Sequence, residues 1–264
     1  MKKILTTSSA LLATLALTSV AITTAHAQDA VYTSKASVSL EPNTDITPPV
    51  DPENPGETVE PETPGGGKPG VGTPGPLSLD FASSFAFGKQ MISSSDVTYY
   101  AHPQRLSDGT VRQNYAQVTD GRGTFAGWTL SVKKDAQFRL SNVDPSVTAE
   151  AVAGLGEYLS GAELSINKGR VNGTVANAKP SIVNENPFVI GNADTVILSA
   201  KENQGMGTWV YAMGAPADYD MNVKGENDVA EKSPIALSVP GATAKKAGSY
   251  TTNLIWTLSD VPGN

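Results

Sequence analysis

The chain has 264 residues, a formal net charge of −7 at pH 7 and no cysteine. Without cysteine no disulfide can stabilise the fold, so a hydrophobic core must do so, and the chain is long enough to build one. An acidic chain also lacks the basic surface that a phosphate backbone requires, so we expect no nucleic-acid partner.

The first 27 residues have the pattern of an export signal. Two lysines near the start are followed by an apolar run over about 11–22 and then by the A-x-A cleavage motif Ala25–Ala27. The apolar run is too short and too rich in Thr and Ser for a stable membrane span, so we expect no membrane insertion. The lysines and the cleavage motif also argue against a buried helix. We predict a signal peptide over 1–27 and a secreted chain that starts at Gln28.

The next segment differs in composition from the rest of the chain. Residues 41–76 are dense in Pro, Gly, Thr and acidic residues, as in DPENPGETVEPETPGGG, and have almost no large apolar side chains. Such a segment buries too little apolar surface to offset the entropy lost on ordering. We therefore predict a disordered, acidic, Pro/Gly-rich spacer over residues 28–76.

Beyond Pro76, short runs of alternating or β-branched residues are separated by turn dipeptides such as Asp-Gly and Pro-Gly. No long helical periodicity is present, and two glycines argue against a helix in the one ambiguous stretch, 147–159. We predict an all-β domain over 77–264, a β-sandwich-like arrangement of short antiparallel strands. The clearest expected strands are 77–81, 129–132, 194–199, 208–211, 235–239 and 249–259.

Two of the three tryptophans lie in copies of one tetrapeptide, Trp-Thr-Leu-Ser, at Trp128–Ser131 and Trp256–Ser259. In a strand, the Trp and Leu of each copy share one face, and the Thr and Ser share the other. A large indole and a branched side chain on one face are typical of a core. The same indoles could instead stack on sugar rings. Both interpretations stay open, and we expect the two strands to lie close together.

These motifs resemble those of the WxL-domain surface proteins of Gram-positive bacteria. The resemblance covers nearly the whole chain, including the signal and the acidic spacer. It includes LSLDFASSFAFGKQMIS at 77–93 and LSGAELSINKG at 159–169. The motifs themselves lie in NYAQVTDGRGTFAGWTLSV at 114–132 and in the C-terminal IALSVPGATAKKAGSYTTNLIWTLSDVPGN.

The resemblance implies a β-rich domain that binds the cell wall non-covalently through peptidoglycan and retains the protein at the cell surface. The sequence has no Leu-Pro-x-Thr-Gly sorting signal and no cysteine to carry a lipid, so we expect no covalent anchor by those routes. The residues implied as wall-binding are those of the two motifs: Trp128, Thr129, Leu130, Trp256, Thr257 and Leu258. If the tryptophans form the core instead, Thr129, Ser131 and Thr257 lie nearer the ligand.

The resemblance also implies an alternative role, as an interaction subunit of a surface complex or as an adhesin. The partners would then be membrane-anchored surface proteins of the same gene cluster or host matrix proteins. A pull-down from cell-surface extract by the protein free of wall would favour this alternative.

Other candidate chemistry is weak. Residues 220–231 nearly fit a calcium loop, but Lys224 stands where an oxygen ligand is required, so a solvated loop is the better interpretation. Two S-x-x-K matches, at 131–134 and 165–168, lie in strand-like sequence without their partner motifs. His102 is the one histidine after the signal. We expect no metal, no cofactor and no enzymatic activity; release of sugars from purified wall would favour the rival, an enzyme acting on wall polymers.

Overall fold

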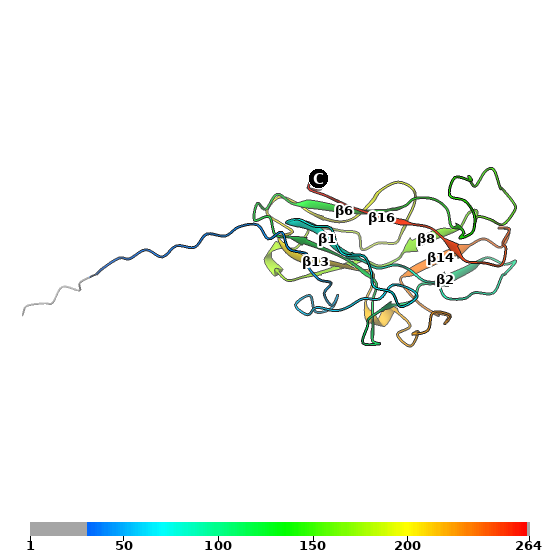
Figure 1. Ribbon diagram of the computed structural model, residues 1–264, viewed down its shortest axis with the longest axis horizontal. Helices are drawn as coiled ribbons and strands as arrows, with labels where there is room; N and C mark the ends of the chain where they lie inside the picture. The colour runs from blue at the N-terminus through cyan, green and yellow to red at the C-terminus, as the bar shows by residue number, and fades with distance from the viewer. Residues whose placement is uncertain (1–30, 263–264) are drawn as a thin grey trace, which may run out of the picture. The chain divides into compact units, whose positions relative to one another are not determined.

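The computed structural model describes residues 31–262 (Figure 1). Contacts divide the chain into two units, residues 1–39 and 40–264. Residues 31–39 of the first unit are exposed and contain no helix or strand. The predicted signal peptide lies outside the described residues. Between residues 31 and 262, no helix has the length and apolar character needed to cross a bilayer.

The second unit contains three antiparallel four-stranded sheets and two short strand pairs. The first sheet has the order β1-β5-β13-β9, and its strands are β1 (Leu77–Ala82), β5 (Tyr115–Asp120), β13 (Gly207–Ala212) and β9 (Arg170–Gly173). The second has the order β10-β12-β6-β16, with β10 (Ile182–Val183), β12 (Thr195–Ala200), β6 (Trp128–Lys134) and β16 (Leu254–Ser259).

The third sheet has the order β11-β8-β14-β2, with β11 (Phe188–Val189), β8 (Glu163–Ile166), β14 (Ile235–Val239) and β2 (Val97–Tyr100). The short pairs are β3 (Gln104–Arg105) with β4 (Val111–Arg112), and β7 (Arg139–Leu140) with β15 (Tyr250–Thr251). Two single-turn 3₁₀ helices complete the described chain, η1 (Ala176–Ala178) and η2 (Pro216–Asp218).

All three sheets contribute to one hydrophobic core. Alternating side chains of each strand point inward, as in Val118 of β5, Leu130 of β6 and Leu164 of β8, and all three are fully buried or nearly so. The prediction of an all-β fold built from short antiparallel strands is therefore confirmed. Five of the six expected segments each form one strand, whereas 249–259 forms two, β15 and β16, in different sheets. The stretch 147–159 forms successive turns without a helix.

Within the predicted spacer over 28–76, residues 48–62 pack on the domain. We call residues 48–62 the strap. Val50, Asp51 and Pro52 in the strap are buried, and Val50 packs with Phe81 and Tyr115 on the face of the first sheet that points away from the main core. The second compact unit begins at Leu40, before the predicted boundary at 77.

The strap has little apolar surface, and polar contacts hold it on the domain. The buried Gln117 side chain accepts a hydrogen bond from the Val50 amide at 2.7 Å and donates one to the Pro48 carbonyl at 3.0 Å. The Asp51 carboxylate pairs with Arg112 at 2.6 Å. A composition argument counts only the apolar side chains of the segment itself. It misses partners that a folded neighbour offers to its backbone and charges.

Candidate functional site

The two Trp-Thr-Leu-Ser copies form neighbouring strands. β6 and β16 pair antiparallel, with Leu258 opposite Leu130 and Trp256 opposite Val132 (Figure 1). The expectation that the two copies lie close together is confirmed. Residues near the middle and near the end of the sequence thus make one structural unit, and β6 is sandwiched between β12 and β16 within the sheet.

Trp128 is fully enclosed by the core. Its exposed fraction is 0 %, and its indole N–H donates a 2.9 Å hydrogen bond to the carbonyl oxygen of Gly205. A glycine is required there because its φ is +79° and because a Cβ would overlap the indole nitrogen and Ala200. The indole N–H therefore has its hydrogen-bond partner inside the protein, which favours a structural role for Trp128.

The second copy is less enclosed than the first. Trp256 and Leu258 are half-buried and pack against the main core from β16, the last strand of its sheet. The remaining tryptophan, Trp209, is buried and donates its indole N–H to Met206. Each of the three indoles is thus part of the core or lies against it.

The threonines lie on the opposite face of the two strands. Thr129 is half-buried, and its hydroxyl is 2.9 Å from that of Ser199 and 2.8 Å from the Val261 carbonyl oxygen. Ser131 is buried. Of the six motif residues predicted to bind the wall, Thr257 alone is exposed. The outward face of β6 and β16 therefore offers little of the motif itself to a ligand.

A carboxylate fixes the chain just before β16. Asp135, which follows β6, accepts hydrogen bonds from the Asn253 amide at 3.0 Å, from its side chain at 2.7 Å and from the Thr252 hydroxyl at 3.1 Å. Partial desolvation raises the pKa of Asp135, but these hydrogen bonds outweigh it, and the pKa lies below its ordinary value. These hydrogen bonds, which we call the Asp135 bracket, align β16 with β6.

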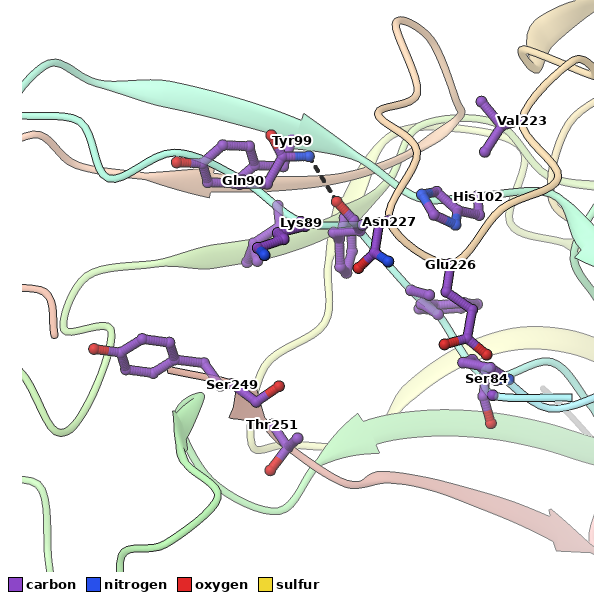
Figure 2. Close-up of a pocket in the computed structure, with 18 of the residues that line it drawn as sticks. Ser84, Lys89, Gln90, Tyr99, His102, Val223, Glu226, Asn227, Ser249 and Thr251 are labelled. Carbon is purple, nitrogen blue, oxygen red and sulfur yellow. Dashed lines mark hydrogen bonds between the residues drawn. The ribbon is translucent and has the colours of Figure 1, made fainter. Parts of the chain in front are cut away.

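A cleft of about 910 Å³ lies away from the motif strands (Figure 2). Its walls are segment 84–92 after β1, parts of β2 and β14, loop 223–227 and segment 245–251. Sequence reasoning missed this cleft because segments distant in the chain build it. The one local signal was Met91 and Ile92, two large apolar residues beside a run of serines, which both remain exposed.

The first wall of the cleft is held in place by backbone contacts. The backbone amide of His102 donates a hydrogen bond to the Ala86 carbonyl at 2.7 Å. The ring nitrogen Nε2 of His102 is 2.9 Å from the Asp228 carbonyl oxygen. Gly88 has a φ of +66°, and a Cβ there would overlap that same carbonyl oxygen. Segment 84–92 and the 223–228 loop are therefore locked together, and the cleft is preformed.

The loop that nearly fits a calcium motif forms a turn. The Asp228 carboxylate accepts backbone hydrogen bonds from Lys224 at 3.1 Å and Gly225 at 2.7 Å, and these lower its pKa. Among residues 31–262, no cluster of three or more His, Asp or Glu side chains is arranged to hold a metal ion. The ring of His102 contacts the backbone carbonyl of Asp228.

Comparison with known proteins gives one result. The family model of the WxL domain, described as surface cell wall-binding, matches residues 27–262. A search of curated proteins and a search of solved structures found no match. The family match begins before the strap and ends beyond β16, so it takes in the whole second unit except its last two residues and part of the first. The chain therefore belongs to the WxL domain family of surface, cell wall-binding proteins.

Proposed function

We propose that this protein binds peptidoglycan non-covalently through its β domain and is thereby retained, after export, on the surface of a Gram-positive cell. The observation that carries the proposal is the match of nearly the whole chain to a family of surface, cell wall-binding domains. Peptidoglycan is the ligand we choose within the wall because it is the polymer that encloses the cell. The chain acts as a binding protein without catalysis.

The arrangement of the motif strands supports an indirect role for the two tryptophans. The buried Trp128 and the half-buried Trp256 join strands from two parts of the chain into one sheet. That sheet supplies a large part of the core, so substitution of either motif weakens binding by destabilising the fold. The ligand itself is held elsewhere on the surface of the domain.

Co-sedimentation with insoluble peptidoglycan stripped of teichoic acids tests the proposal. The exported chain, residues 28–264, is the protein to use, because the strap packs on the domain. We expect the parent protein to pellet with peptidoglycan and to stay in solution without it. If the folded parent remains in the supernatant, binding to peptidoglycan is wrong.

A second candidate function is attachment to another exported protein, either a membrane-anchored surface protein or a host matrix protein. The observation that favours it is the outer edge of β16, which pairs with no strand of the described chain. Exposed edges accept a strand from a partner. The edge carries exposed Ile255 and Thr257. An Ile255→Lys variant that loses a protein captured from surface extract, while still pelleting with peptidoglycan, would assign this role to the edge.

A further inference from the structure

The cleft between segment 84–92 and segment 245–251 has a charge opposite to that of the chain. Five basic residues line it against two acidic ones, a surplus of three positive charges on a protein whose net charge is −7. The acidic residues are Glu62 and Glu226. Such a concentration of positive charge in a concave surface attracts anionic ligands.

Three of the five cations have no carboxylate partner in the described structure. Arg105 pairs with Glu62, and Lys246 pairs with Glu157 outside the cleft. The Lys245 ammonium donates to three backbone carbonyls of the preceding turn. Lys89 and Lys224 are exposed, and no ion pair or side-chain hydrogen bond involves either ammonium among residues 31–262. Both lysines line the cleft, Lys89 from segment 84–92 and Lys224 from loop 223–227.

Apolar surface is exposed beside Lys89 in segment 84–92. Met91 is 88 % exposed and Ile92 is 60 % exposed, and the half-buried Tyr99 lines the same cleft. Figure 2 shows Tyr99, Lys89 and Asn227 on one side of the open space and Ser249 and Thr251 across from them. Large exposed apolar side chains next to polar groups are typical of a ligand groove.

The unpaired lysines, the exposed apolar side chains and the polar groups of the cleft together match one ligand class, an N-acetylated glycan that carries short peptides with free carboxylates. Carboxylates pair with ammonium groups, while acetamido methyl groups and the C–H faces of sugar rings pack on apolar and aromatic side chains. Amide and hydroxyl groups such as those of Asn227 and Ser249 can bond the sugar hydroxyls. A cleft of about 910 Å³ lies near the upper end of the range for ligand pockets and accommodates a short stretch of such a polymer.

The geometry points to this cleft as the site where the protein holds peptidoglycan, with Lys89 and Lys224 binding carboxylates of the peptide arms. The inference rests on the proposed function. It goes further by placing the ligand away from the Trp-Thr-Leu-Ser strands and by naming the charged group that is recognised.

The test measures the apparent Kd of the exported chain for stripped peptidoglycan. The variants are Lys89→Glu, Lys224→Glu and a matched control, Lys179→Glu, in which an exposed lysine outside the cleft undergoes the same charge change. Melting followed by circular dichroism checks that all three variants fold. We expect each cleft variant to bind about tenfold more weakly and the control to match the parent. Peptidoglycan whose carboxyl groups have been amidated should likewise bind the parent at least tenfold more weakly.

The outcomes separate this inference from the proposed function. If the parent pellets with stripped peptidoglycan and both cleft variants bind equally well, the cleft is not the site, although wall binding stands. If the parent binds only wall that retains teichoic acid, phosphate is the anion recognised and the carboxylate assignment is overturned. If the folded parent binds no peptidoglycan preparation, the proposed function fails and the inference fails with it.

Discussion

The indole N–H of Trp128 and the carbonyl oxygen of Gly205 form a 2.9 Å hydrogen bond within the closed core. The bond joins β6 to the loop that follows β12, so the first Trp-Thr-Leu-Ser copy organises a loop as well as a strand. Gly205 permits the bond because it adopts a φ of +79° and brings its backbone against the ring.

A Gly205→Ala substitution should therefore be costly. Its methyl group would overlap the indole nitrogen of Trp128 in addition to straining the backbone. Gly109→Ala is a matched control, because Gly109 has a φ of +80° with open space around it. We expect Gly109→Ala to lower the free energy of unfolding by about 1 kcal/mol and Gly205→Ala by about 2–4 kcal/mol. Urea denaturation measures both, and equal losses would show that the contact with Trp128 is unimportant.

The two motif tryptophans should differ in how much they stabilise the fold. Trp128 is fully buried and hydrogen-bonded, whereas Trp256 is half-buried on an edge strand. We expect Trp128→Ala to cost about 3–5 kcal/mol and Trp256→Ala about half of that. Thermal melting of both variants beside the parent gives the order. A larger loss for Trp256→Ala would mean that β16 is more deeply enclosed in solution than in this structure.

Much of the fold could be predicted from alternation alone. A run such as Asp194–Ser199 is β-branched and flanked by turn residues, and it forms β12 within one residue of the expected bounds. Asn172-Gly173, by contrast, looks like a turn but ends strand β9 instead. Gly173 lies opposite Trp209, and a Cβ there would overlap that ring. The sequence alone does not distinguish a glycine required for close packing from a glycine required for a turn.

The site was less predictable than the fold. Alternation showed that Trp128 and Leu130 share a face, yet it could not show whether that face points to the core or to solvent. The cleft is built by residues as distant as Lys89 and Tyr250, and its excess of positive charge appears only after folding. The packing of the strap was not predicted for a related reason, because its partners Gln117 and Arg112 lie in other parts of the chain.

Removal of β16 should unfold the domain. A chain ending at Asn253 exposes the edge of β6 and loses Leu254, Trp256 and Leu258 from the side of the core. We expect it to lack the cooperative melting of the parent. The control is a chain ending at Asp260, which keeps all of β16 and loses only residues such as Val261, whose carbonyl accepts from Thr129. Circular dichroism and melting distinguish them. A folded chain ending at Asn253 would contradict the view that the two motifs form one structural unit.

The strap should open when its ion pair is removed. Asp51 is buried and pairs with Arg112, so Asp51→Ala should weaken local closure by roughly 1–2 kcal/mol, which is about five- to thirtyfold in the opening equilibrium. A Glu-specific protease then cleaves after Glu57 faster by a similar factor. Asp45→Ala, on an exposed residue before the strap, is the control and should leave the rate unchanged. Equal cleavage of Asp51→Ala and the parent would show that the pair does not hold the strap.

The Asp135 bracket should make β16 sensitive to acid. The pKa of Asp135 is lowered in the folded protein, because the hydrogen bonds from Asn253 and Thr252 outweigh the effect of desolvation. A carboxyl group whose folded pKa lies below its unfolded value contributes stability above the unfolded pKa, near 4, and loses that contribution as the pH falls through the folded pKa.

Asp135→Asn removes this contribution at neutral pH, where we expect a loss on the order of 1 kcal/mol. The difference between the variant and the parent should then shrink as the pH is lowered from 6 to 3. Asp144→Asn is a suitable control for titration, because the pKa of Asp144 is also lowered, by hydrogen bonds from Ser146, yet its bonds stay within one exposed turn and hold no strand. Melting across this pH range, with hydrogen exchange of the β16 amides, measures the effect. A constant gap between parent and Asp135→Asn, or equal protection of β16 in both, would show that the carboxylate does not secure the second motif.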